Sequence, residues 1–223
     1  MCGRYSYTTS LEAGEVILPA GDAAINLSPR YNVAPSQYCP IIPQRDPRQT
    51  YMYRWGLIPF WAKDISIGYK MINARSETVT EKSTYARPFQ KSRCLVLADG
   101  FYEWKGKGKN KQPYRIVLRS GKPFYFAGLY SEWKSPEGNG IPSFTILTTE
   151  PNELVAPIHN RMPVILNKEA ALNWLTPSAE AFDLLNLLRP YPMEEMEAYP
   201  VSKAVGNVRN DSEELIAPVD SPS

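Results

Sequence analysis

Proline is the residue that most restricts how this chain can fold, because 21 of its 223 residues are prolines. Each proline fixes φ and lacks a backbone N–H, so it ends or shortens a regular element. The chain is therefore expected to contain short elements and long, well-determined loops. The 43% hydrophobic and 22% charged residues are ordinary for a globular protein and exclude a disordered, collagen-like or coiled-coil chain.

Short β-rich runs separated by turn residues predict a core made mainly of strands. The expected strands are 38–44, 50–55, 93–98, 101–105, 113–118, 123–131 and 143–149. A turn at Asp46-Pro47 joins the first two, and Asp99-Gly100 and Ser120-Gly121 predict two further hairpins. The expected helices are 10–18, 84–91, 168–175 and 178–188, the last with Ser178 as its N-cap. We expect one α+β domain, in which helices surround a curved or barrel-like antiparallel sheet.

Charge and cysteine content narrow the possible partners. The formal net charge is only +2, so any nucleic-acid surface must be a local basic patch. The chain has a single histidine, His159, and three cysteines without a CxxC pair, so we expect no metal and no cofactor. No apolar run reaches the roughly 20 residues of a membrane helix. The polar N-terminus lacks a signal peptide, so we expect a protein of the cytoplasm or of a nucleoid or nucleus. We also expect a monomer.

Cys2 is the first candidate for chemistry. A small residue after the initiator methionine allows Met1 to be removed, which leaves an α-amine and a thiol on the same residue. Such a 1,2-aminothiol condenses with an aldehyde, because the amine forms a Schiff base and the sulfur closes a five-membered thiazolidine. The alternative is that Cys2 is incidental in a frayed terminus.

Glu103 and His159 are candidates for proton transfer. Glu103 lies among aromatic residues, where desolvation raises the pKa of a carboxyl and suits it to act as an acid. The alternative is a solvent-facing strand residue. His159 lies in a loop between prolines, and its unperturbed pKa is near neutrality. A lone histidine is also often structural or exposed.

Three further segments have side chains suited to binding. Asn73 can donate and accept hydrogen bonds, and Arg75 is suited to hold a phosphate, although a polar turn explains both equally well. The segments 30–35 and 55–61 are rich in aromatic residues, proline and backbone polar groups, which is typical of loops that stack unpaired bases. Core packing is the alternative for Trp55.

Seven short motifs occur together in one order along the chain. They are MCGRY (1–5), RYNVAP (30–35), WGLIP (55–59), INARSE (72–77), ADGFYEW (98–104), HNRMP (159–163) and PVSKAVGN (200–207). In this combination the chain closely resembles the SOS response-associated peptidase (SRAP) family. The resemblance implies an SRAP domain over residues 1–219. The last residues, 220–223, are expected to form a disordered tail.

The resemblance implies suicide crosslinking to abasic sites in single-stranded DNA, which shields these sites from strand cleavage during the DNA damage response. It implies that Cys2 is the nucleophile, that Asn73 orients its amine, that Glu103 is the acid/base and that His159 shuttles protons and assists reversal of the crosslink. The residues expected to bind DNA are Arg4, Asn32, Pro35, Trp61, Arg75, Thr148 and Arg161.

Three other functions are weighed against this one. The family name suggests a cysteine peptidase in which Cys2 and His159 form a nucleophile–base pair, with the Met1-Cys2 bond as its own substrate. A Schiff base on abasic DNA can also undergo β-elimination, which would make the protein a lyase. A plain nucleic-acid-binding module would leave Glu103 and His159 without a role.

Overall fold

The computed structural model describes residues 2–8, 28–135 and 138–220. Five of the strands in the described chain form a barrel, which closes because β10 pairs with both β4 and β9. The order around the barrel is β10, β4, β3, β6 and β9. The bounds are β3 (Tyr38–Pro43), β4 (Tyr51–Trp55), β6 (Arg93–Ala98), β9 (Phe124–Lys134) and β10 (Gly140–Thr149). The expected α+β fold with a barrel-like sheet is confirmed.

Three short strands extend this barrel. They are β5 (Asn73–Arg75), β11 (Met162–Pro163) and β12 (Ile165–Leu166). β10 pairs with β11 in the antiparallel direction but with β4 and β5 in the parallel direction. The sheet is therefore mixed, and the expectation of a purely antiparallel sheet needs this correction. The parallel pairing carries β5 to the C-terminal half of β10, next to Thr148.

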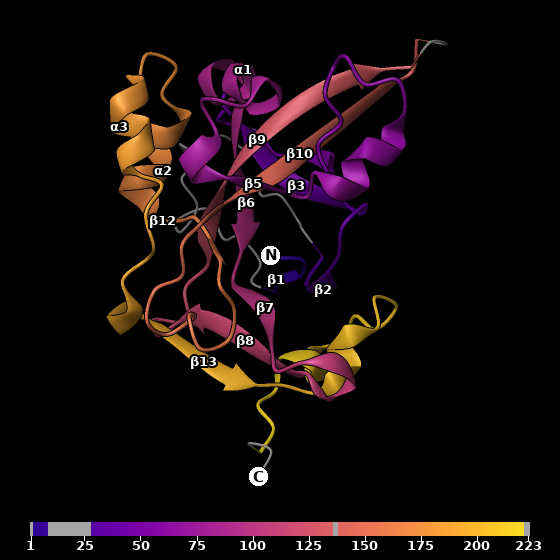
Figure 1. Ribbon diagram of the computed structural model, residues 1–223, viewed down its shortest axis with the longest axis vertical. Coiled ribbons are helices and arrows are strands. Elements are labelled where there is room, and N and C mark those ends of the chain that lie inside the picture. Colours follow the sequence, from indigo (N-terminus) through magenta and orange to yellow (C-terminus); the bar gives the residue numbers. More distant parts are fainter. Residues whose placement is uncertain (1, 9–27, 136–137, 221–223) are drawn as a thin grey trace.

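A second, five-stranded sheet has the order β13-β8-β7-β1-β2 and is antiparallel throughout. Its strands are β1 (Tyr5–Tyr7), β2 (Arg30–Val33), β7 (Gly100–Lys105), β8 (Gln112–Leu118) and β13 (Met196–Pro200). Figure 1 shows β8 and β13 at one end of the molecule and α1 at the other. Tyr5 joins the two sheets, because its ring packs edge-on against Trp55 and Phe126 of the barrel.

The two hairpins expected at Asp99-Gly100 and Ser120-Gly121 are wrong. β6 pairs with β3 and β9, whereas β7 pairs with β1 and β8, so the chain crosses from one sheet to the other at Asp99. It crosses back between β8 and β9. Turn residues report a change of direction but not which strand becomes the partner. The turn at Asp46-Pro47 does join two paired strands, β3 and β4.

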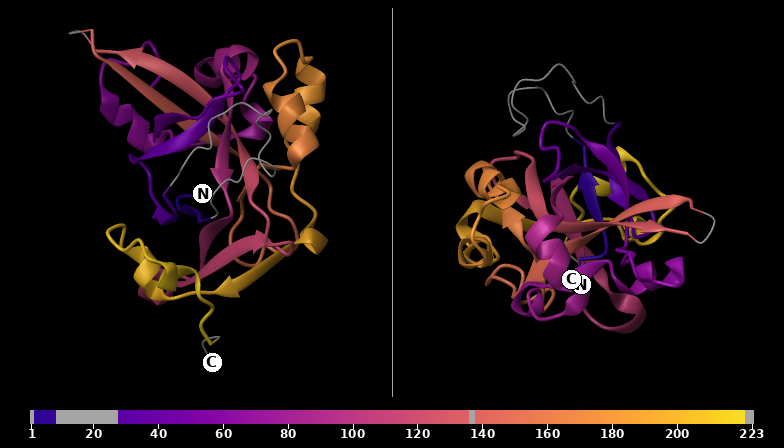
Figure 2. Two further views of the ribbon diagram at one scale, coloured as in Figure 1. Left: turned by 180° about the vertical axis from the view of Figure 1, so that it is seen from behind. Right: turned by 90° about the horizontal axis from the view of Figure 1, so that it is seen from above.

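Helices α1 (Ser83–Lys91), α2 (Lys168–Leu175) and α3 (Ala181–Asn186) lie outside the barrel, and α2 and α3 share one side of it (Figure 2). The first two confirm the predictions at 84–91 and 168–175. The third is shorter than 178–188 and its N-cap is Glu180, not Ser178. The helix expected at 10–18 lies outside the described residues. In the described part of the chain, no helix is both long and apolar enough to cross a membrane.

Short 3-10 segments complete the fold. They are Ile65–Lys70, Ser76–Thr78, Gly108–Asn110, Met193–Glu195, Lys203–Gly206 and Glu213–Ile216. The last two follow β13 and pack against the second sheet, where Val205 and Leu215 join Tyr102 in a small separate core. A bridge between Val201 and Pro218 returns the chain to the sheet. Of the tail expected at 220–223, residues 221–223 lie outside the described residues.

Candidate active site

Cys2, Glu103 and His159 come together beside the second sheet. Cys2 precedes β1, Glu103 lies on β7, and the register Tyr5↔Phe101 brings these two strands side by side. The His159 Nδ1 atom lies 3.9 Å from a carboxylate oxygen of Glu103. Cys2 is close enough to Glu103 for the carboxylate to influence its thiol. Three segments far apart in the sequence therefore contribute to one site.

Glu103 is buried, with 3% of its surface exposed. Desolvation disfavours the charged carboxylate and raises the pKa of Glu103 to about 7. An acid with this pKa is partly protonated and partly ionised near neutral pH, so it can give and take a proton. The alternative of a solvent-facing residue on an alternating strand is excluded by this burial.

His159 is held in a defined orientation. Its Nδ1 accepts a hydrogen bond from the backbone N–H of Arg161 at 3.1 Å. Partial burial lowers the pKa of His159, so the imidazole is mostly neutral at pH 7. The side chain is 26% exposed, so it lies between the buried carboxyl and the solvent. This position suits the transfer of protons between the two.

The Cys2 thiol is fully buried and weakly bonded, with its Sγ 3.8 Å from the carbonyl oxygen of Arg4. Burial, and then the charge of Glu103, raises the pKa of the thiol well above its usual range. The sulfur is therefore held as a neutral thiol. A thiolate nucleophile is normally found where the surroundings lower this pKa.

A second group of expected residues lies along the end of β10. Thr148 pairs with Arg75 of β5 on one side and with Pro163 of β11 on the other. Arg161 donates to the Thr148 carbonyl at 2.6 Å. Asn73, on β5, donates from Nδ2 to the carbonyl of Ile72 at 3.0 Å, and its Oδ1 is a buried acceptor without a hydrogen-bond partner in the described chain.

Arg161 also makes a two-pronged ion pair. Its two terminal nitrogens lie 2.6 and 2.9 Å from the carboxylate oxygens of Glu77. The Arg161 hydrogen bonds lower the pKa of Glu77, and the charge of Arg75 adds to this. Both arginines therefore lie around one carboxylate. Arg75 is exposed, whereas the side chain of Arg161 is only 14% exposed.

Arg4 and Asn32 are already committed to bonds within the protein. Arg4 donates to the Asn32 side-chain oxygen at 2.7 Å and to the carbonyls of Val205 and Gly206. Asn32 is 0% exposed, so its side chain has no surface to offer to DNA in this conformation. Asn32 therefore has a role inside the fold, and its assignment as a DNA contact stays a prediction.

Pro35 lies on the loop between β2 and β3, and Trp61 lies on the loop that follows β4. Pro35 is half-buried and precedes Ser36, whose positive φ of 74° turns the loop toward Trp55. Trp61 is 51% exposed and Phe60, beside it, is 61% exposed. Aromatic rings this open to solvent are available for stacking.

Two charged neighbours of this site were missed in the sequence. Lys111, at the end of the basic loop between β7 and β8, is close enough to lower the pKa of both Glu103 and His159, although burial remains the larger influence on each. Glu77 is the other. The sequence signal for Glu77 was its position in the INARSE motif, two residues after Arg75. For Lys111 the β7–β8 pairing, which was not predicted, would have been needed.

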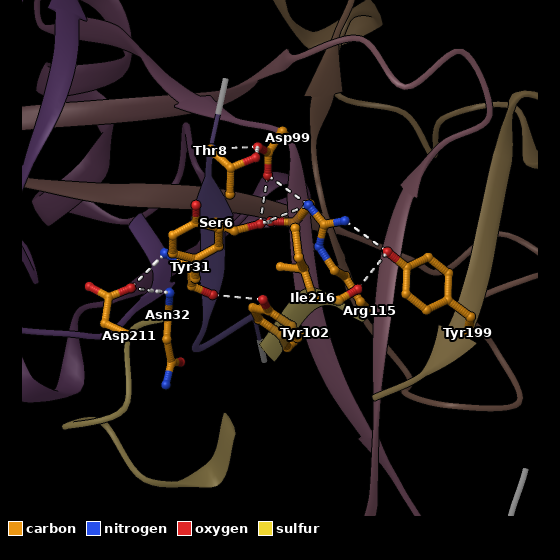
Figure 3. A network of polar contacts seen from close by, with 11 residues as sticks. Ser6, Thr8, Tyr31, Asn32, Asp99, Tyr102, Arg115, Tyr199, Asp211 and Ile216 are labelled. Carbon is orange, nitrogen blue, oxygen red and sulfur yellow. Dashed lines mark hydrogen bonds and ion pairs between the residues drawn. The ribbon is translucent and has the colours of Figure 1, made fainter. Parts of the chain in front are cut away.

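A buried polar network holds the sheet in which the site lies (Figure 3). The Asp99 carboxylate accepts from the Ser6 hydroxyl at 2.6 Å and from Arg115 at 2.9 Å, and it also binds Thr8. Gly100 leaves room for this, because a Cβ there would lie 2.8 Å from Arg115 Nε. The network joins β1 to the start of β7 and to β8, and so holds together the strand that follows Cys2 and the strand that carries Glu103.

The comparisons with known proteins agree with the motifs. The family model "SOS response associated peptidase (SRAP)" matches residues 1–208. The chain belongs to the SRAP family. The resemblance inferred from the seven motifs is thereby confirmed.

Its relatives include bacterial and vertebrate SRAP proteins. The chain is 48% identical to "Abasic site processing protein YoqW" of Bacillus subtilis, over 97% of this chain and 99% of that protein. It is 35% identical to "Abasic site processing protein HMCES" of Gallus gallus, over 86% and 67% of the two chains. A solved structure from Bacteroides thetaiotaomicron superposes with a TM-score of 0.85 at 29% identity, covering 98% of this chain and all of that one.

Among the described residues, no group of three or more His, Cys, Asp or Glu side chains is placed to hold a metal ion. The three cysteines are free thiols and all are buried.

Proposed function

We propose that this SRAP protein recognises abasic sites in single-stranded DNA and links to them covalently through Cys2. The observation that carries the proposal is the cluster of Cys2, Glu103 and His159. It combines the one residue that can present an amine and a thiol together with a buried acid whose pKa is about 7. The relatives named as abasic site processing proteins support the choice of substrate.

The reaction begins with loss of Met1, which frees the Cys2 amine. The amine attacks the aldehyde of the ring-opened deoxyribose and forms an imine with loss of one water. Glu103, in its protonated form, donates a proton to the departing oxygen. The neutral thiol then adds to the imine carbon, and its proton passes to the nitrogen. The product is a thiazolidine, and ring closure is favoured because both nucleophiles belong to one residue.

His159 and Asn73 assist this sequence. The neutral His159 ring, 3.9 Å from Glu103, moves protons between the carboxyl and solvent in either direction, which includes reopening of the ring. The unbonded Oδ1 of Asn73 is an acceptor suited to orient the Cys2 amine. Closure to the thiazolidine diverts the imine from β-elimination, so we expect protection of the strand and not lyase cleavage.

DNA contact is proposed for a local basic patch. Arg75 is exposed, and Arg161 lies beside it at Thr148 and Glu77. A phosphate would take the place of the Glu77 carboxylate on the Arg161 guanidinium, since both ligands accept two parallel hydrogen bonds. Trp61 and Pro35 supply surfaces for unpaired bases. We expect the protein to act as a monomer.

The peptidase alternative is weaker on physical grounds. A cysteine peptidase needs a thiolate that a substrate can reach, and an activating base at the sulfur. Here burial raises the pKa of the Cys2 thiol, which disfavours the thiolate that peptidolysis needs but leaves the neutral thiol that the crosslink uses. We therefore restrict any peptidase activity to the Met1-Cys2 bond.

The test is incubation with single-stranded DNA that carries one abasic site, followed by a denaturing gel. We expect a heat-stable adduct that forms without a reductant. A tetrahydrofuran analogue, which lacks the aldehyde, is the matched control and should give none. Absence of an adduct from the natural abasic site, in protein that has lost Met1, would overturn the proposal.

A further inference from the structure

The segment from Ala204 to Asp211, here called the strap, crosses the edge of the second sheet and binds it through polar contacts. Asp211 accepts backbone N–H bonds from Tyr31 at 2.6 Å and Asn32 at 3.0 Å, and pairs with the side chain of Arg30. These N–H groups belong to β2, the edge strand of the sheet. One carboxylate thus caps an edge that would otherwise be open.

The side chain of Asn32, on β2, also binds the strap. Its Nδ2 lies 3.1 Å from the carbonyls of Val205 and Asn207 and 2.8 Å from that of Asn210. An amide is the side chain that can do this while its own oxygen accepts from a cation. That oxygen accepts from Arg4 at 2.7 Å.

Arg4 is therefore fixed at both ends. Its guanidinium donates to Asn32 and to the strap carbonyls of Val205 and Gly206, at 2.6 and 3.0 Å for the two carbonyls. Its backbone carbonyl accepts from the N–H of Tyr102 at 3.0 Å, and Tyr102 precedes Glu103 on β7. The same carbonyl is the partner of the Cys2 thiol.

A nucleophile at the end of a chain must be held in place if it is to react from one position. Chain ends fray unless they are tied down, and after Met1 is lost, Cys2 is the end of the chain. Only Gly3 separates it from Arg4. A residue anchored two positions from the end restricts where the amine and the thiol can go.

We propose that the strap is a positioning element for the nucleophile: Asp211 and Asn32 hold it in place, it holds Arg4, and Arg4 keeps Cys2 against Glu103. In its effect on crosslinking, this inference rests on the proposed function. It assigns Asp211 and Asn32 as positioning residues and makes the Arg4 guanidinium a clamp whose bonds within the protein are needed whether or not it also meets a phosphate.

The test compares Asp211→Ala with Glu213→Ala. Both variants remove one negative charge from neighbouring exposed positions, so they change the field felt by DNA equally. Three quantities are measured: the rate of adduct formation at saturating abasic DNA, the affinity for intact single strands, and the rate at which a small thiol reagent modifies the Cys2 peptide, read by mass spectrometry.

Asp211→Ala is expected to slow adduct formation by about tenfold or more, because a misplaced reacting group loses its proximity advantage. The thiol of Cys2, fully buried in the wild type, should at the same time be modified several times faster. Affinity for intact strands should stay within about twofold, and Glu213→Ala should match the wild type throughout.

A conservative variant separates positioning from simple loss of stability. Asp211→Asn keeps one oxygen for the two backbone N–H groups and loses the ion pair with Arg30, so it should recover most of the rate. Each variant is compared below its measured unfolding temperature. Unchanged Cys2 labelling in Asp211→Ala, or equal losses of rate and affinity, would overturn the inference. If the wild type makes no adduct, the proposed function fails, while the labelling contrast still reports whether the strap restrains Cys2.

Discussion

The barrel and the second sheet pair their buried polar side chains differently. In the barrel, apolar residues such as Leu95 and Phe126 are fully buried, and the buried Arg93 side chain donates to backbone carbonyls. The second sheet buries Ser6, Asn32, Asp99, Glu103 and Arg115. Apolar burial is non-directional, whereas buried polar groups must find specific partners. We infer that apolar burial in the barrel stabilises the fold. This stabilisation offsets the free-energy cost of burying the polar groups that hold the reactive site in the second sheet.

The largest effect on crosslinking is expected from a substitution of the nucleophile in the second region. Cys2→Ala keeps an α-amine but has no sulfur, so the thiazolidine cannot close. We expect complete loss of the adduct that is stable without reductant, while borohydride still traps a Schiff base. The measurement is a denaturing gel with and without borohydride. A heat-stable adduct formed by the variant alone would show that another residue closes the linkage.

Glu103→Gln should have the next largest effect. It keeps the size of the side chain and removes the acid, so adduct formation should slow by about 10²-fold or more, in the range usual for general acid–base catalysis. Single-turnover kinetics at saturating DNA give the rate, and binding to intact strands is the control that should hardly change. In the wild type the rate of imine formation should fall as pH rises above about 7, where Glu103 loses its proton. A variant with the wild-type rate and pH profile would remove Glu103 from the mechanism.

Matched core variants sharpen the comparison of the two regions. Arg115→Met leaves Asp99 buried without its cation, which costs about 3–5 kcal/mol of unfolding free energy. Leu95→Ala opens a cavity in the barrel at a similar cost of about 2–5 kcal/mol. Urea denaturation measures both. At temperatures where both are folded, only Arg115→Met should also slow crosslinking, and equal crosslinking rates would contradict the division.

The pH dependence of stability tests the burial of Glu103 separately. Its folded-state pKa of about 7 lies above the ordinary value of 4.5, so the folded protein holds a proton that the unfolded chain releases. The resulting stabilisation is complete below about pH 4.5 and is lost as pH rises through 7. Relative to Glu103→Gln, the wild type should lose on the order of 3 kcal/mol over this window. Parallel denaturation curves at pH 5 and pH 8 measure the difference, and identical pH trends for the two proteins would contradict it.

The smallest effect is expected at the basic patch. Arg75→Gln removes one exposed positive charge, so affinity for intact single strands should weaken modestly, and the slope of log K against log salt should fall by about 1. Arg119→Gln is the control, because Arg119 is an exposed arginine outside both the strap and the basic patch. An Arg75 variant with an unchanged salt slope would place the DNA elsewhere.

Local sequence signals predicted local structure well. Helical spacing predicted α2 to the residue, and β-rich runs predicted β6, because these depend on neighbours in the chain. Pairing was less predictable. Asp99-Gly100 has the composition of a hairpin turn, yet Asp99 is bound by Ser6 and Arg115, residues distant in sequence. A buried network decides this crossing, and no short-range pattern reports it.

The candidate site shows the same limit. The motifs identified Cys2, Glu103 and His159, and the structure brings them together. Asn32 was assigned to DNA because its motif is rich in polar and aromatic residues, but its partners are backbone carbonyls more than 170 residues away. Asp211 gave no signal, because its function depends on the strand edge that it covers and not on its own neighbours.

The most direct test of the central claim is to map the crosslink. Protein incubated with abasic single-stranded DNA is digested with protease and nuclease, and the modified peptide is sequenced by mass spectrometry. The account predicts one modified residue, Cys2, at the N-terminus of a chain without Met1. Its mass should increase by that of the sugar fragment less one water, with neither a free amine nor a free thiol left on it. A crosslink on a lysine, or on a chain that retains Met1, would contradict the account.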